Sequence, residues 1–155
     1  MVFTFHFLIF LKKKKNQVPF LLMVVDILMQ IYAQDILNER LEALKLKKFP
    51  NLHQPKNIAL LNFDFASFHQ PLANDDVTGF VGMLEHMSTN KQLSLSNIFS
   101  QKSPSRNFLL HETTSFGSTK IANFIIDNFP FLLTKKNILE DNAIDVVTKR
   151  KHLKV

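Results

Sequence analysis

Cysteine and tryptophan are absent from this chain, and its 155 residues include only three glycines and one tyrosine. The lack of cysteine excludes disulfide frameworks, thiolate zinc sites, iron–sulfur clusters and cysteine nucleophiles. Apolar residues make up 46% of the chain and charged residues 21%, which is not the composition of a disordered protein. A chain of this length is long enough for one hydrophobic core, so we expect a single small domain.

The formal net charge of +6 is concentrated near the two ends of the chain. The residues that carry it are Lys12, Lys13, Lys14 and Lys15 near one end, and Lys149, Arg150, Lys151 and Lys154 near the other. Without these eight residues the net charge is 6 − 8 = −2, so the middle of the chain is not basic. We expect the clusters 12–15 and 149–151 to contact an anionic membrane surface, with nucleic acid the weaker alternative. A solvated connector and a solubilising tail are the structural alternatives.

The N-terminal third holds two apolar runs, residues 3–11 and 18–33, on either side of the lysine cluster. Neither reaches the roughly 20 residues of a confident membrane span, and Asp26 would cost about 2.5–3.5 kcal/mol at bilayer depth. Residues 18–48 lack glycine, and Pro19 is tolerated in a first turn, so we expect one long helix. We favour a helix of the domain core over membrane or partner insertion. We disfavour a cleaved secretory signal that ends near Ala33, because of Asp26.

In the rest of the chain, apolar residues recur in some segments with the two-residue period of a strand and in others with the period of a helix. Residues 58–68 alternate as a strand does, and shorter strands are expected at 108–111 and 131–134. Helices are expected at 77–87, capped by Asp75 or Asp76, at 119–129, capped by Ser118, and after Asn137, with a loop at 88–107. The last helix is expected to carry Ile138, Leu139, Ile144 and Val147.

This order of elements predicts an α/β or α+β fold. Its small, mixed or mostly parallel sheet would pack with three to four helices and follow a long apolar N-terminal helix. We expect an N-terminal extension at residues 1–17, a single globular domain at 18–148 and a basic tail at 149–155.

Two short segments suggest chemistry. The segment from Asn62 to Ser67 resembles the first motif of haloacid-dehalogenase-like phosphatases, in which two aspartates lie two residues apart after an apolar strand. The resemblance implies an acid–base role for Asp64, but Asn62 stands at the nucleophile position and cannot form an aspartyl-phosphate. Separately, Ser118, Thr119 and Lys120 begin an expected helix, whose free N–H groups favour an anion.

The six histidines have none of the close spacings that place two metal ligands on one helix face. We therefore expect no metal site, no cofactor and no catalytic residue. The sequence favours a non-enzymatic intracellular protein whose apolar and basic N-terminus contacts a membrane surface or a protein partner. The alternatives are a small hydrolase-type α/β enzyme with a site near Asp64, and a fragment or mispredicted reading frame in which Met29 is another start.

Overall fold

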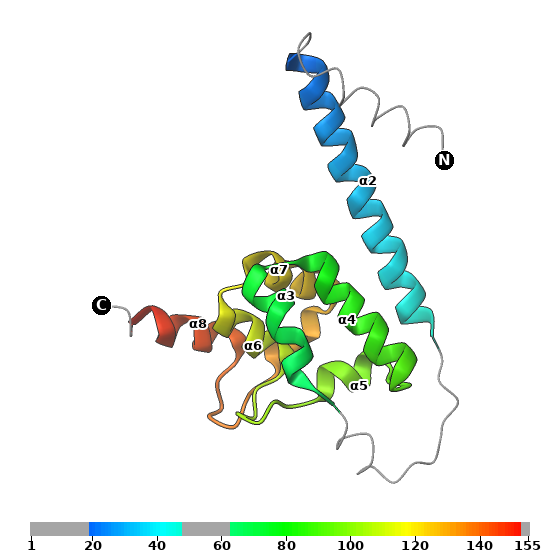
Figure 1. Ribbon diagram of the computed structural model, residues 1–155. Coiled ribbons are helices and arrows are strands. Elements are labelled where there is room, and N and C mark those ends of the chain that lie inside the picture. The colour runs from blue at the N-terminus through cyan, green and yellow to red at the C-terminus, as the bar shows by residue number, and fades with distance from the viewer. Residues whose placement is uncertain (1–18, 48–62, 153–155) are drawn as a thin grey trace. The chain divides into compact units, whose positions relative to one another are not determined.

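The computed structural model describes residues 19–47 and 63–152, without the side chains of residues 151 and 152. The chain divides into two compact units, Met1–Glu42 and Ala43–Val155. Their described elements are all helical (Figure 1). In chain order they are α2 (Pro19–Leu46), η2 (Phe65–Phe68), α3 (His69–Asn74), α4 (Val77–Asn90), α5 (Leu95–Ser100), α6 (Leu109–Phe116), α7 (Thr119–Asn128), η3 (Pro130–Thr134) and α8 (Ala143–His152).

The long helix expected at residues 18–48 is confirmed as α2, a single helix of 28 residues. Pro19 occupies its first position, where the missing N–H costs no hydrogen bond. No glycine or further proline interrupts it. At about 1.5 Å per residue it is roughly 42 Å long. Its first part makes up the described residues of the first unit, and its last turn belongs to the second.

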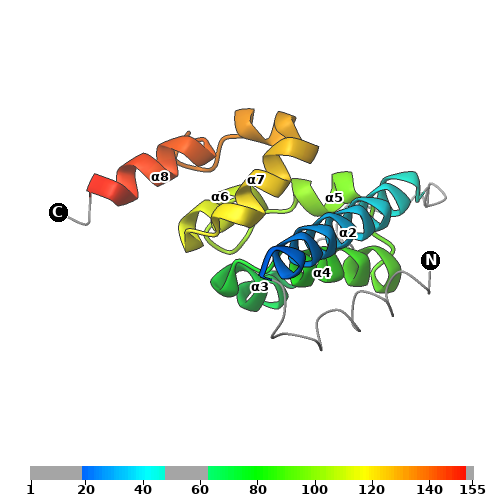
Figure 2. The ribbon, with the colours of Figure 1, turned by 90° about the horizontal axis from the view of Figure 1, so that it is seen from above.

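The core of the second unit is built from α4, α6 and α7. Helix α7 packs on both α4 and α6, and α6 also packs on α8. In Figure 2, α6 and α7 lie side by side. The phenylalanines form part of this core: the ring of Phe80 lies 5.6 Å from that of Phe68 and 6.3 Å from that of Phe124. The most deeply buried apolar side chains of these three helices are Phe80, Val81, Leu84, Met87, Leu109, Leu110, Ile121 and Ile125.

The prediction of an α/β or α+β fold is wrong, because residues 19–47 and 63–152 contain no strand. Residues 58–62 of the expected first strand lie outside the described residues. Its other end forms η2, where Asp64 caps the turn. Phe65 and Phe68 of η2 and Leu72 of the following α3 are buried at helical intervals of three and four. Phe63 and Phe65 fit a period of two, whereas Phe65 and Phe68 fit a helical period, so the pattern was ambiguous.

The two shorter strands are also helical. Residues 108–111 form the start of α6, whose Leu109, Leu110 and His111 are all buried. Consecutive buried residues suit a short helix enclosed by neighbours as well as a strand. Residues 131–134 lie in η3, where Pro130 occupies the first turn. The expected loop at 88–107 contains α5, which Ser94 caps through a bond from the Asn97 N–H.

The helix expected at 77–87 is confirmed as α4, and Asp76 caps it by accepting from the Gly79 N–H at 3.0 Å. A Cβ at Gly79 would lie 2.4 Å from an oxygen of that carboxylate, so a larger residue there would require the Asp76 side chain to shift. The helix expected at 119–129 is confirmed as α7, which ends at Asn128. The last helix begins at Ala143 rather than after Asn137, since Asn142 accepts from the N–H groups of the two residues after Ala143.

Candidate functional site

Helix α2 leaves large apolar side chains in contact with solvent. An 18-residue window within it has a mean hydropathy of 1.7, and only 11% of that window is buried. The exposed fractions are 69% for Phe20, 52% for Met23 and 53% for Ile31. Other exposed apolar residues of this stretch are Leu21, Ile27 and Leu28. At about 1.5 Å per residue the window is roughly 27 Å long, close to the thickness of a bilayer core. This helix is therefore long and apolar enough to cross a membrane.

The apolar residues of α2 surround the helix in its first half and form a stripe in its second. Successive residues are about 100° apart, so Phe20 and Met23 lie one turn apart on adjoining faces, whereas the exposed Leu21 points about 160° away from Met23. From Gln34 onwards, polar and charged residues recur every few positions. A helix that is apolar on all sides requires apolar surroundings on all sides, such as a large core or lipid.

Charged residues lie within and just before the apolar half of α2. Asp26 lies within the apolar half of α2 and is exposed. The predicted anion-contact residues Lys12 to Lys15 lie outside the described residues, and in the sequence they precede α2 by a few residues. A lysine cluster next to an apolar helix is typical of the side of a membrane segment that stays in contact with anionic headgroups.

The predicted anion site at the start of α7 contains a carboxylate of the protein itself. The carboxylate of Asp75 accepts from the N–H of Lys120 at 2.9 Å and from the N–H of Ile121 at 3.0 Å. Asp75 ends α3 in a left-handed conformation, with φ of 50°, which directs it toward α7. An external anion at this helix end would have to displace Asp75.

The side chains at the same helix start have structural contacts. Ser118 is buried, and its hydroxyl donates to the carbonyl oxygen of Leu72 rather than capping α7. The hydroxyl of Thr119 donates to the carbonyl oxygen of Gly117 at 3.4 Å. The sequence indicated that this helix end favours negative charge, but it did not indicate that Asp75, 45 residues from Lys120, supplies it.

The basic residues of the C-terminal cluster bind other parts of the second unit. The ammonium group of Lys149 lies 2.6 Å from both oxygens of the Asp141 carboxylate. The guanidinium of Arg150 donates to the carbonyl oxygen of Ser115 in α6. Both contacts connect α8 to neighbouring segments, and the side chain of Lys149 is still 61% exposed. The side chain of Lys151 lies outside the described part of the chain.

Asp64, the centre of the enzyme alternative, acts as a helix cap. One carboxylate oxygen accepts from the Ala66 N–H at 2.9 Å, and the other accepts from the Ser67 hydroxyl at 2.9 Å.

The histidines lie in separate surroundings: His69 contacts the ring of Phe116, and His86 contacts Asn90. Within the described residues, no three His, Cys, Asp or Glu side chains are placed to hold a metal ion.

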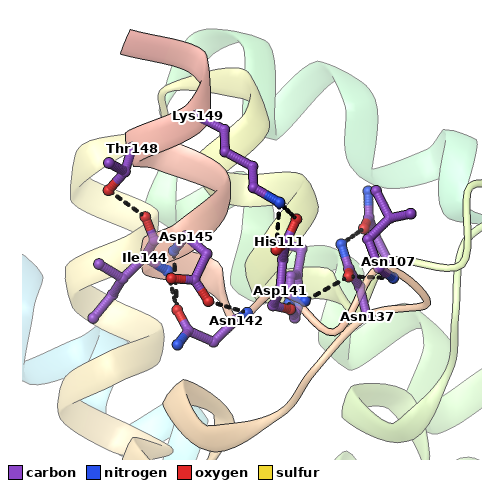
Figure 3. A network of polar contacts seen from close by, with 10 residues as sticks. Asn107, His111, Asn137, Asp141, Asn142, Ile144, Asp145, Thr148 and Lys149 are labelled. Carbon is purple, nitrogen blue, oxygen red and sulfur yellow. Dashed lines mark hydrogen bonds and ion pairs between the residues drawn. The ribbon is translucent and has the colours of Figure 1, made fainter. Parts of the chain in front are cut away.

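A polar network fixes the turn that precedes α8 (Figure 3). The buried Asn137 side chain accepts from the N–H of Leu139 at 2.9 Å and of Asp141 at 3.1 Å, and donates to the Asn107 side chain at 2.9 Å. His111, which is fully buried, lies with Nε2 2.9 Å from the carbonyl oxygen of Asp141. A carbonyl oxygen can only accept, so Nε2 carries the hydrogen.

This turn exposes residues that the sequence interpretation assigned to a helix. Ile138 is 49% exposed, Leu139 is 70% exposed and Ile144, at the start of α8, is 61% exposed. The expected helical face of Ile138, Leu139, Ile144 and Val147 is therefore not formed. The run of polar residues from 140 to 142, directly after Leu139, was the available sign of a turn.

Comparison with protein-family models, with curated proteins and with solved structures finds no match to this chain.

Proposed function

We propose that this chain is a non-enzymatic, membrane-associated protein in which the apolar half of α2 inserts into a lipid bilayer and the second unit is held at the membrane surface. The observation that carries the proposal is the apolar 18-residue window of α2, of which 11% is buried. Lipid supplies an apolar environment on every side of a helix, as this half of α2 requires. Burial of each of its large side chains contributes about 1.5–3 kcal/mol.

The arrangement of apolar residues favours lipid over a protein groove. A partner protein that binds a helix in a groove recognises a stripe of residues spaced by three, four and seven. Phe20 and Met23 are three residues apart and can share such a stripe, but Leu21 points about 160° away from Met23, so a narrow groove that binds the first two would leave Leu21 in water. Lys12 to Lys15 support the same conclusion, because each lysine near an anionic surface contributes about 1 kcal/mol.

Asp26 limits the depth of insertion that we propose. A carboxylate at the bilayer centre costs about 2.5–3.5 kcal/mol on insertion scales, and less where it reaches the interface. The favourable contribution of several large apolar side chains exceeds this cost. We therefore propose insertion of α2 with Asp26 toward the headgroup side.

The test is co-sedimentation of the full chain with neutral and anionic vesicles at low and high salt. We expect binding to both, with stronger, salt-sensitive binding to anionic vesicles. The substitution Ile31→Lys places a charge in the apolar half and should weaken binding roughly 100-fold, from a cost of about 2.5–3.5 kcal/mol. The matched control Leu46→Lys adds the same charge at a 77% exposed site at the end of α2, and should change binding less than about threefold.

Two results would contradict this function. If the full chain stays in the supernatant with both kinds of vesicle, the apolar surface of α2 has another partner. If the chain recovered from cells begins after Ala33, as its intact mass would reveal, the segment is a removed signal and not an anchor.

A further inference from the structure

We propose that the turn at residues 137–141 is a second, interfacial membrane contact, in which Ile138 and Leu139 enter the headgroup region of an anionic bilayer. The inference depends on the proposed function, because it assumes that α2 holds the second unit close to a membrane. It adds a specific surface of the second unit and the lipid chemistry that this surface recognises.

The first observation is the exposure of three large aliphatic side chains close together in the sequence. Leu139 is 70% exposed, Ile144 is 61% exposed and Ile138 is 49% exposed. Single exposed apolar residues are common on protein surfaces, but a group of them is typical of an interaction site. In the same unit, most leucines and isoleucines of α4, α6 and α7 are buried completely, namely Leu84, Leu109, Leu110, Ile121 and Ile125.

The second observation is that the turn is held rigidly in this conformation. The N–H of Asn137 donates to the carbonyl oxygen of Asp141 at 2.9 Å, and the Asn137 side chain bonds to the backbone of Leu139 and Asp141. The ion pair from Lys149 to Asp141 and the bond from His111 connect the same turn to α8 and α6 (Figure 3). The exposed side chains therefore project from a fixed support, so binding orders little new structure and incurs little entropic cost.

The third observation is the charge around the turn. Lys135 and Lys136 directly precede Asn137 and Ile138. Of the carboxylates that follow, Asp141 is paired with Lys149, and Asp145 accepts from the Asn142 N–H. Lys136 lies 3.6 Å from Glu140, and the two side chains are 57% and 80% exposed. An exposed ion pair of this kind is weak, so a lipid phosphate can replace Glu140 as the partner of Lys136. Lysines beside exposed aliphatic residues are the combination that anionic interfaces attract.

The lipid surface is favoured over a protein partner because of the proposed anchor. A surface tethered beside a bilayer meets it at high effective concentration, so a contact of two or three side chains is sufficient to add to the binding. A contact of this size is too small for a stable complex between two freely diffusing proteins.

The absence of tryptophan permits a direct test in the full chain. Leu139→Trp places a single fluorescent reporter at the exposed tip, and Phe116→Trp places the matched reporter at a 42% exposed site in α6. Circular dichroism first establishes that both variants keep the helical content of the original chain. Each variant is then titrated with anionic vesicles that carry a quencher on the lipid chains, while co-sedimentation is measured in parallel.

We expect the emission of Leu139→Trp to shift to shorter wavelength and to be quenched in anionic vesicles, and that of Phe116→Trp to remain unchanged. Adding Lys135→Gln and Lys136→Gln should reduce the quenching of Leu139→Trp. If the chain co-sediments with vesicles but Leu139→Trp is not quenched, this inference is wrong while the proposed function stands. If its emission shifts with protein concentration alone, the turn contacts a second copy and the inference is wrong. If the chain does not co-sediment, both proposals fail.

Discussion

The first half of α2 and the second unit use similar apolar residues in opposite ways. In the second unit, Phe80, Leu84 and Ile121 are fully buried, and polar residues cap the helix ends. In α2, Phe20 and Ile31 are more than half exposed, although the helix is longer than any other described here. Apolar content alone therefore does not identify a core: similar side chains are buried in the second unit and exposed in the apolar half of α2.

The largest expected effect is a difference in the free energy of unfolding when one apolar side chain of each region is replaced by alanine. Phe80→Ala removes a fully buried ring and should lower the free energy of unfolding by about 3–5 kcal/mol. Leu28→Ala removes a 47% exposed side chain in α2 and should lower it by less than about 0.5 kcal/mol. Urea unfolding followed by circular dichroism measures both.

Equal losses of stability in the two variants would show that α2 is part of the folded core in water. The distinction between the two regions would then disappear, and with it the main argument for lipid.

A smaller effect is expected from the cap that joins α3 to α7. Asp75→Ala removes two hydrogen bonds to the start of α7 and places alanine in a left-handed conformation, which together should cost about 1–2 kcal/mol. Asp75→Asn keeps an acceptor and tolerates the left-handed backbone, so it should cost less. Thermal unfolding measures the difference, and Asp127→Ala, at an exposed position in α7, is the control.

If Asp75→Ala and Asp127→Ala unfold at the same temperature, Asp75 does not stabilise the start of α7. The helix end would then be open to an external anion, as the sequence first suggested.

The sequence predicted the elements whose signals are local. Helix α2 followed from an uninterrupted run without glycine, and the Asp76 cap followed from an aspartate just before an apolar helical pattern. The fold class was wrong because the proposed strands were short apolar runs, which neighbouring helices enclose as readily as a sheet does. The spacing of Phe65, Phe68 and Leu72 was the helical signal, but Phe63 and Phe65 also fit alternation.

The candidate surfaces could be predicted only in part. The apolar and basic character of the N-terminal region is visible in the sequence, but the low burial of α2 is not, and a core helix was therefore the favoured interpretation. The bond from Asp75 to α7 and the bond from His111 to Asp141 span 45 and 30 residues, beyond the reach of local patterns. The exposure of Leu139 depends on both the turn and the network around Asn137.

The most direct test of the central claim is hydrogen exchange of the backbone amides of the unmodified full chain, with and without neutral vesicles. A bilayer removes water from the amides that it surrounds, so we predict that exchange in the apolar half of α2 becomes much slower when vesicles are added. Exchange in α4 and α7, which are already in a core, should stay nearly the same. If the chain binds vesicles but the exchange rates of the amides stay unchanged throughout α2, insertion of this helix is contradicted.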